Sequence, residues 1–167
     1  MVNILTYLRN LKSNLKKKEN FYSLFLILII FCLDRYSKNL IITDLLDETF
    51  FINDYLNLNL IWNTGIGFGL FSNHSTIIYN FITILIGIII LVLIYICLDV
   101  KKIDKIIYCL IIGGAIGNFY DRLIFQAVPD FIDLHYNNFH WFTFNVADIF
   151  ISIGIITFII MSFFVKN

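Results

Sequence analysis

Two aspartates in the C-terminal part of the chain have side chains and spacing suited to acid–base catalysis. Asp130 lies in residues 128–132 and Asp148 in residues 144–148, on either side of an aromatic-rich segment. A carboxylate beside an apolar run of membrane length costs free energy, because its charge lies in or near lipid. Such residues are therefore candidates for function. In an aspartyl hydrolase, an ionised carboxylate takes a proton from water while a neutral partner polarises the scissile carbonyl. The two aspartates therefore predict hydrolysis, provided that the fold brings them together.

The residues needed for other hydrolytic mechanisms are incomplete in the sequence. There is no His-Glu-x-x-His metal motif, and the histidines are scattered through predicted loops: His74, His135 and His140. Ser37 and Lys38 are adjacent, so their side chains diverge on a helix and cannot form a catalytic dyad. The cysteines lack paired or metal-ligand spacing, and we interpret them as small hydrophobic residues: Cys32, Cys97 and Cys109. The sequence therefore lacks the residue patterns that covalent or metal-dependent hydrolysis would need.

The residues that precede each aspartate predict its local setting. Asn145 comes just before Asp148 at the start of a predicted helix, where an Asn cap and an acidic first turn satisfy free N–H groups. We therefore expect Asp148 to hold the negative charge more easily, although strongly coupled carboxyl groups titrate as a pair. Pro129 precedes Asp130 and is expected to fix a local turn.

The composition predicts a polytopic α-helical membrane protein. Of the 167 residues, 59% are hydrophobic and 14% are charged, and the mean hydropathy is +0.84. One helical span needs about 20 residues. Apolar runs then predict four spans, at about residues 21–42, 76–98, 103–121 and 146–165. These spans nearly exhaust the chain, so residues 1–167 form one predicted domain. The net charge of zero gives no sign of a nucleic-acid partner.

The distribution of Lys and Arg predicts the orientation of the spans. Basic residues gather in residues 1–20 and between the second and third spans, whereas the segment after the first span is acidic. The positive-inside rule then places both termini in the cytoplasm and the two longer loops outside, with the aspartates near the outer face. Residues 1–20 also carry apolar side chains at helical spacing, which predicts an interfacial amphipathic helix. A disordered basic arm is the alternative.

The two outer loops differ in pattern. Residues 55–62 alternate apolar and polar side chains, which is typical of a half-buried strand, and a glycine-rich segment follows. This pattern favours a small sheet on the membrane surface, to whose edge an extended substrate could add a strand. A glycine-rich turn covering the bundle is an equal alternative. The aromatic residues of segment 126–144 are interpreted mainly as an interfacial belt.

Further polar residues lie at the outer ends of the first and third spans. Asp34 and Lys38 are one helical turn apart, and we interpret them as an ion pair that locks helices together. Asp121 and Arg122 end the third span and are expected to bond to neighbouring loops as a scaffold for the aspartates. In the same span, a pair of glycines four residues apart allows close helix packing: Gly113 and Gly117.

Taken together, these motifs resemble the lipoprotein signal peptidase (signal peptidase II) family. The resemblance covers nearly the whole chain after the first twenty residues. It rests on five motifs in order: Asp34-Arg35-x-x-Lys38, Asn63-Thr64-Gly65 with Phe68, Gly113-Gly114-Ala115-x-Gly117-Asn118-x-x-Asp121-Arg122, Val128-x-Asp130-Phe131-Ile132 and Phe144-Asn145-x-Ala147-Asp148. Pro129 departs from the pattern, because the family usually has an aliphatic residue there.

The resemblance implies a fold and a set of site residues. The fold would be four transmembrane helices, a small extracytoplasmic β-sheet and a short amphipathic periplasmic element. Asp130 and Asp148 match the catalytic aspartates of the family. The positions that line or support its active site match Asp34, Lys38, Asn63, Gly65, Phe68, Asn118, Asp121, Arg122, Asn145 and Ala147.

The resemblance also implies a substrate and a location. The expected activity is that of an aspartyl endopeptidase, which cuts diacylglyceryl-modified prolipoproteins before the lipid-modified cysteine. The expected location is the bacterial cytoplasmic (inner) membrane, with membrane lipids as neighbours, globomycin as a peptide inhibitor, and no metal or organic cofactor. Two other classes remain open from the residues themselves. One is a small transporter or channel subunit with a proton or cation relay, and the other is a non-catalytic membrane scaffold.

Overall fold

The computed structural model describes residues 18–44, 49–65, 76–100, 102–137 and 139–164. Predictions made for residues 1–17 and for Phe68 lie outside these residues, and the expected short amphipathic periplasmic element is not among the elements described. In chain order the elements are α2 (Lys18–Asp44), β1 (Phe50–Asn53), β2 (Leu56–Asn63), α3 (Thr76–Asp99), α4 (Lys102–Phe125), β3 (Val128–Tyr136), β4 (Phe139–Phe144) and α5 (Val146–Phe164).

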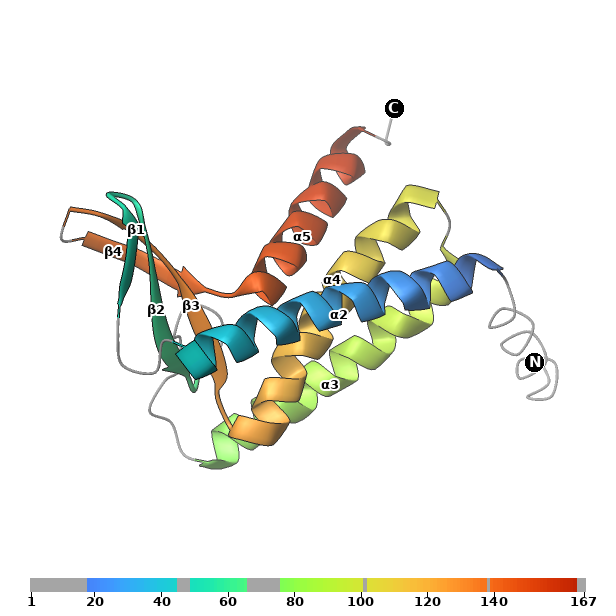
Figure 1. Ribbon diagram of the computed structural model, residues 1–167. Coiled ribbons are helices and arrows are strands. Elements are labelled where there is room, and N and C mark those ends of the chain that lie inside the picture. Colours follow the sequence, from blue (N-terminus) through green and yellow to red (C-terminus); the bar gives the residue numbers. More distant parts are fainter. Residues whose placement is uncertain (1–17, 45–48, 66–75, 101, 138, 165–167) are drawn as a thin grey trace, which may run out of the picture.

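The four helices form a bundle with α4 at its centre. Figure 1 shows the sheet at one end of the bundle and successive helices running in opposite directions. Helix α4 packs against α2, α3 and α5. In its apolar stretch 39% of the residues are buried, against 17% in α3 and 11% in α5. The aspartate of α5 and the ends of α2 and α4 therefore meet beside the sheet.

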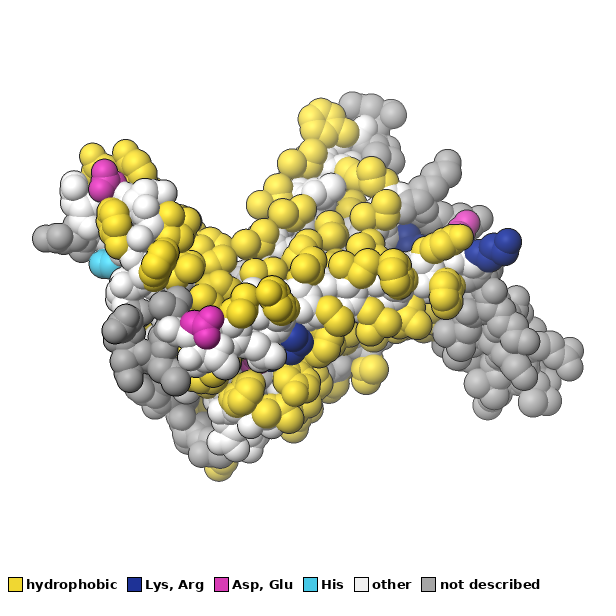
Figure 2. Space-filling model, in the orientation of Figure 1, with side chains coloured by type: hydrophobic (Ala, Val, Ile, Leu, Met, Phe, Trp, Pro, Cys, Tyr) yellow, Lys and Arg dark blue, Asp and Glu magenta, His cyan; other side chains and the backbone are white. Residues whose placement is uncertain are grey.

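Three of the helices are long and apolar enough to cross a membrane, namely α3, α4 and α5. The sequence predicted a fourth span in α2, which has 27 residues but carries Asp34, Arg35 and Lys38. Asp34 and Lys38 are fully buried inside the bundle, so they do not face lipid. The exposed side chains of α2 include Phe25 and Leu28. Figure 2 shows that hydrophobic side chains cover most of the visible face of the bundle.

Glycines on α4 set how closely its neighbours approach. A Cβ on Gly113 would lie 2.8 Å from Cβ of Ile30 in α2, and one on Gly117 would overlap the carboxylate of Asp34. The predicted small-residue packing of Gly113 and Gly117 is therefore confirmed. Gly114 faces α5, where an added Cβ would lie 2.5 Å from the backbone oxygen of Ala147.

Replacing Gly114 by alanine is expected to destabilise the bundle. The obstacle is a backbone oxygen at the start of α5, which cannot rotate away as a side chain could, so overpacking should cost about 1–3 kcal/mol. Thermal unfolding in detergent micelles measures the change. Gly87→Ala is the matched control, because its Cβ would meet only the edge of the Phe119 ring at 3.1 Å. Equal melting of the two variants would contradict the prediction.

The sheet is antiparallel throughout, in the order β1-β2-β3-β4. The strand predicted for residues 55–62 is confirmed by β2. The aromatic segment 126–144, interpreted mainly as an interfacial belt, forms the hairpin of β3 and β4, and Tyr136, Phe139 and Trp141 are exposed on it. Gln126 and Asn137 have φ of 54° and 52°, so left-handed residues end α4 and turn the hairpin. The hairpin was not predicted, because aromatic residues are common both in strands and at membrane interfaces.

Pro129 lies inside β3 and does not form the local turn that the sequence suggested. It pairs with Trp62 of β2, whereas β4 pairs with β3 only from Ile132 onward. One side of β3 is therefore free of a neighbouring strand at Pro129. A proline, which lacks an N–H donor, is tolerated at such an edge position. Asp130 follows within the same strand, and its Cα pairs with that of Ile61.

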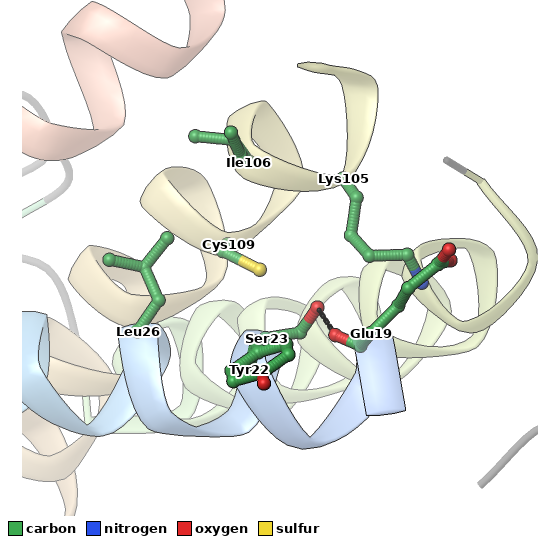
Figure 3. A pocket seen from close by; sticks show the side chains of 7 residues that line it. All are labelled: Glu19, Tyr22, Ser23, Leu26, Lys105, Ile106 and Cys109. Carbon is green, nitrogen blue, oxygen red and sulfur yellow. Dashed lines mark hydrogen bonds between the residues drawn. The ribbon is translucent and has the colours of Figure 1, made fainter. Parts of the chain in front are cut away.

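A cluster of polar residues around Lys105 lies at the end of the bundle away from the sheet. The Lys105 ammonium group donates to the backbone oxygens of Cys97 (2.7 Å) and Leu98 (3.4 Å), so a cation caps the C-terminus of α3. Figure 3 shows Lys105 and Cys109 on α4 facing Ser23 on α2 across a cavity of about 270 Å³. Cys97 and Cys109 are buried free thiols in the hydrophobic core, as their apolar surroundings predicted.

Candidate active site

Asp130 and Asp148 are brought to one cavity by two different elements. Asp130 is the third residue of β3, and Asp148 lies in the first turn of α5. Both line a cavity of about 210 Å³ whose other polar walls are Asn63, Asn118 and Arg122. Asp130 is 4% exposed, and Asp148 is half-buried. The fold therefore brings the two aspartates together, as the predicted chemistry requires.

Asn145 fixes the position of both aspartates. Its Oδ1 accepts a hydrogen bond from the Asp148 backbone N–H at 3.0 Å, and its own backbone N–H donates to Asp148 Oδ2 at 3.2 Å. This reciprocal pair is a capping box at the start of α5, in agreement with the predicted Asn cap. The Asn145 side chain also donates from Nδ2 to Asp130 Oδ1 at 2.6 Å. One buried residue thus ties the first turn of α5 to β3.

The two remaining carboxyl oxygens also accept hydrogen bonds from asparagine. Asn63 Nδ2 donates to Asp130 Oδ2 at 2.8 Å, and Asn118 Nδ2 donates to Asp148 Oδ1 at 2.7 Å. Among the described residues, the four donors to the pair are neutral amides, whereas a lysine or arginine would neutralise the carboxylates. These hydrogen bonds hold the two carboxyl groups in place without neutralising them. Burial and nearby charges can therefore shift the proton affinity of each group.

Arg122 closes a ring of hydrogen bonds around the cavity. Its guanidinium donates to the backbone oxygens of Gly65 (3.1 Å) and Asn118 (3.2 Å), and the Gly65 N–H donates to Asn63 Oδ1 at 2.9 Å. The expected bond from Arg122 to a neighbouring loop is therefore present. Asn63 and Arg122 are both members of this ring. The structure shows them joining the walls of the site, with Asn63 bonded to Asp130.

A buried ion network lies beneath the aspartates. Lys38 Nζ contacts Asp34 Oδ2 at 2.9 Å, Asp121 Oδ2 at 2.7 Å and Asn118 Oδ1 at 2.8 Å. The predicted Asp34–Lys38 ion pair is therefore confirmed. Asp121 was expected to bond to loops, but in the described part of the chain it contacts Lys38 and Arg35 of α2. The correction follows from helix packing, because the end of α4 lies against α2.

The network joins the aspartate pair through two residues. Lys38 holds the carbonyl side of the Asn118 amide, so that the NH₂ side of this amide faces Asp148. Asp34 Oδ1 accepts the Ala147 backbone N–H at 3.0 Å, which fixes the start of α5 from the side of α2. Asp34 and Ala147 are two of the positions matched to the active site of the family. They position Asp148 by holding the start of its helix.

Arg35 is a further supporting residue, and its role was not predicted from the sequence. Its guanidinium pairs with Asp121 through both carboxylate oxygens and lies 5.0 Å from the centre of the Tyr120 ring. It also donates to Asp34 at 3.0 Å. Arg35 stands beside Asp34 in the first motif, but its main partner lies 86 residues away. No local pattern signals such a contact.

The surroundings of Asp130 favour its protonated form. Burial and, to a smaller extent, the nearby charge of Asp148 raise the pKa of Asp130 from 3.8 to about 6, although hydrogen bonds from Asn63 and Asn145 act in the opposite direction. Asp130 therefore keeps its proton up to about pH 6. This arrangement agrees with the expectation that Asp148 carries the negative charge. An acid and a base at one cavity can activate water and polarise a carbonyl group.

Comparisons with known proteins agree on one family. The model of the family described as signal peptidase (SPase) II, peptidase A8, matches residues 26–164. The chain is 52% identical to the lipoprotein signal peptidase of Pelagibacter ubique over 160 residues, covering 93% of this chain and 95% of the relative. It is 37% identical to that of Blochmanniella pennsylvanica over 156 residues, covering 89% and 94%. A solved bacterial membrane enzyme superposes with a TM-score of 0.73 at 28% identity, covering 85% and 87% of the two chains.

Proposed function

Because the chain belongs to the signal peptidase II family of aspartic peptidases, which remove signal peptides from prolipoproteins, we propose that Asp130 and Asp148 are its catalytic pair. The observation that carries this proposal is the cavity that both carboxyl groups line, with Asn145 bonded to each of them. The protein is a bacterial membrane protein with four helices. The cavity lies at the end of the helix bundle that adjoins the sheet.

The proposed reaction uses the two carboxyl groups in opposite protonation states. Ionised Asp148 takes a proton from a water molecule, which attacks the scissile carbonyl carbon. Neutral Asp130 donates its proton toward the carbonyl oxygen as negative charge develops there. The tetrahedral intermediate then collapses and the C–N bond breaks. The leaving nitrogen receives the proton held by Asp148, and the re-forming carbonyl returns its proton to Asp130, so both carboxyl groups regain their starting states. The amide donors from asparagine keep both carboxyl groups aligned through these steps.

The proposed substrate is a prolipoprotein that carries a diacylglyceryl-modified cysteine, cut before that cysteine. A diacylglyceryl group would hold the scissile bond near the membrane surface, where the ends of the helices meet the sheet. We place the protein in the cytoplasmic (inner) membrane with both termini in the cytoplasm and the site near the outer face. The positive-inside rule supports this orientation, and the four alternating helices of the bundle are compatible with it.

A gel-shift assay tests the proposed function. Purified full-length protein in detergent micelles is incubated with a diacylglyceryl-modified prolipoprotein, with and without globomycin. Loss of the signal peptide shifts the band, and globomycin is expected to prevent this shift. A matched substrate that lacks the diacylglyceryl group is the control for lipid dependence. Cleavage of both substrates at equal rates would contradict the proposed substrate class.

The activity is expected to fall as pH rises above about 6. Neutral Asp130 is the proposed acid, and its pKa is about 6, so the active form is lost as this group ionises. The value of kcat/KM should then decrease about tenfold for each further pH unit. Measuring kcat/KM for the lipidated substrate between pH 5 and pH 8 checks this expectation. A flat profile above pH 6 would contradict the assignment of the acid.

The same raised pKa makes a separate prediction about stability. Folded Asp130 binds its proton more tightly than the unfolded chain does, so ionisation of this group opposes folding. Its contribution should lower the free energy of unfolding as pH rises from about 4 through about 6, by up to about 3 kcal/mol for two pKa units. Chemical unfolding at pH 4.5 and pH 8 measures the change. Asp130→Asn should remove this part of the pH dependence, and an unchanged dependence would contradict the prediction.

A further inference from the structure

A groove lies in the half of the bundle away from the sheet. Helices α2 and α3 both pack against α4, and between them is a groove of about 300 Å³. Its floor includes Ile112 of α4, which is fully buried, whereas Phe21 and Leu24 on its α2 side are 68% and 54% exposed. Ile27 of α2 and Ile94 of α3 also line it. The groove therefore has a buried floor and a rim that faces the surroundings of the bundle.

The groove is polar at one end and apolar along the rest of its length. Asn20 donates from Nδ2 to the backbone oxygen of Leu98 at 3.3 Å, which joins α2 to α3 where the groove ends. The ammonium group of Lys105 lies at the same level, bonded to Asn20 and to the end of α3. From Asn20 to Ile27, a helix length of about 10 Å, the α2 side is apolar apart from Ser23. A lipid has the same division, with a polar head group and an apolar chain.

The dimensions of the groove fit one hydrocarbon chain of the nearer leaflet. Half of the hydrocarbon core of a bilayer is about 15 Å thick, so a groove of about 10 Å stays within one leaflet. At van der Waals contact a hydrocarbon chain is about 4–5 Å across, so this length of chain occupies roughly 150–200 Å³. A helix with its side chains is about 10–12 Å across and occupies more than roughly 700 Å³ over the same length. The groove is therefore large enough for an acyl chain and too small for the transmembrane helix of a partner.

The charge at this end of the bundle favours an anionic head group. Residues 1–20 and 99–105 contain eight Lys and Arg residues against three Asp and Glu residues. Among them, Lys18 is exposed at the start of α2. Basic side chains near the membrane surface attract anionic lipids, by about fivefold in affinity for each Lys or Arg. The expected lipid is therefore an anionic phospholipid.

We propose that this groove binds one acyl chain of an anionic phospholipid of the cytoplasmic leaflet, with the head group at the level of Asn20. The walls of an empty groove lack van der Waals contacts, and the chain supplies them. The bound lipid joins α2 to α3 beside α4. It lies at the opposite end of the bundle from Asp130 and Asp148 and takes no part in their chemistry. Its assignment to the cytoplasmic leaflet rests on the orientation proposed above, whereas the fit of the chain does not.

Lipid binding is measured on the full-length protein in detergent micelles, by native mass spectrometry and by thermal unfolding. Phosphatidylglycerol is compared with phosphatidylcholine that carries the same acyl chains. Phosphatidylglycerol is expected to bind at least about fivefold more tightly. At ten times its Kd it should raise the Tm by about 3–6 °C. The preference should weaken as the salt concentration rises, because salt screens exposed charges.

Leu24→Trp tests the groove itself. The larger side chain fills the groove from its exposed rim, so the fold should survive, whereas the affinity for phosphatidylglycerol should fall by at least about fivefold. Leu33→Trp is the matched control, because Leu33 is 48% exposed on the opposite side of α2 and does not line the groove. This variant should bind the lipid as the wild type does. Neither measurement uses a prolipoprotein, so the result is independent of the proposed reaction.

Three results would overturn the proposal. The first is equal affinity for phosphatidylglycerol and phosphatidylcholine, which would show that the charge of the head group is not recognised. The second is equal affinity of the wild type and Leu24→Trp for phosphatidylglycerol. The third is an equal loss of affinity in Leu24→Trp and Leu33→Trp, which would show that the lipid covers the surface of the bundle without a preferred groove.

Discussion

Replacing Asp148 by asparagine is expected to leave a folded protein that no longer removes signal peptides at a useful rate. Asparagine has nearly the same shape but cannot take a proton from water. General acid–base groups contribute about 10²- to 10⁴-fold to rates, so kcat should fall by that factor. Asp148 is half-buried, and its two oxygens accept hydrogen bonds from Asn118 Nδ2 and from the Asn145 N–H. One of these donors would face the new NH₂ group, so the change should cost about 1–3 kcal/mol of stability without unfolding the protein.

The measurement compares initial rates on the lipidated substrate with the thermal midpoint of each variant. Asp104→Asn is the matched control, because it makes the same substitution at an exposed carboxylate near the start of α4. That variant should retain wild-type rates. Full turnover by Asp148→Asn would end the proposal for the catalytic pair. Retained binding of globomycin by the inactive variant would show that the site remains assembled.

Replacing Lys38 by methionine is expected to cause the largest loss of stability. Lys38 is fully buried and contacts the carboxylates of Asp34 and Asp121, so its removal leaves two buried acids with less compensation. Breaking a buried ion pair from one side costs about 3–5 kcal/mol. Activity should fall as well, even below the unfolding temperature, because Lys38 orients Asn118 against Asp148.

Lys18→Met is the control for Lys38→Met, because it removes an exposed lysine of the same helix. Unfolding of both variants is followed by heating in the same detergent. Equal melting of the two would show that the buried network contributes little. Adding Asp121→Asn to Lys38→Met removes one of the uncompensated carboxylates, so the double variant should recover part of the lost stability.

Two pairs of aspartates near the sheet are held by different kinds of partner, which separates structure from chemistry. Asp34 and Asp121 contact lysine and arginine side chains, so their charges are compensated and hold α2 to α4. Asp130 and Asp148 contact amide donors, which position them without a neutralising cation. A carboxyl group can exchange a proton near neutral pH only in the second setting, because a direct ion pair would favour its ionised form.

Several features of this protein follow from local sequence. Apolar runs of about 20 residues require helices in a membrane, because backbone groups must be satisfied internally. The alternation in residues 55–62 predicted β2, and the four-residue spacing of Asp34 and Lys38 predicted their ion pair. Asn145 before Asp148 predicted the helix cap. Each of these features depends on residues within one or two turns of each other, so the pattern contains the whole interaction.

Other features were decided only by packing between distant segments. Asp121 pairs with α2 and not with a loop, because α4 lies against that helix. Asn63 reaches Asp130 only through the pairing of β2 with β3, and the histidines meet only in the hairpin. Periodicity tells which face of an element is buried, but the partner on that face depends on how the elements are stacked. The sequence by itself therefore identified the two aspartates, and the tertiary structure decided what surrounds them.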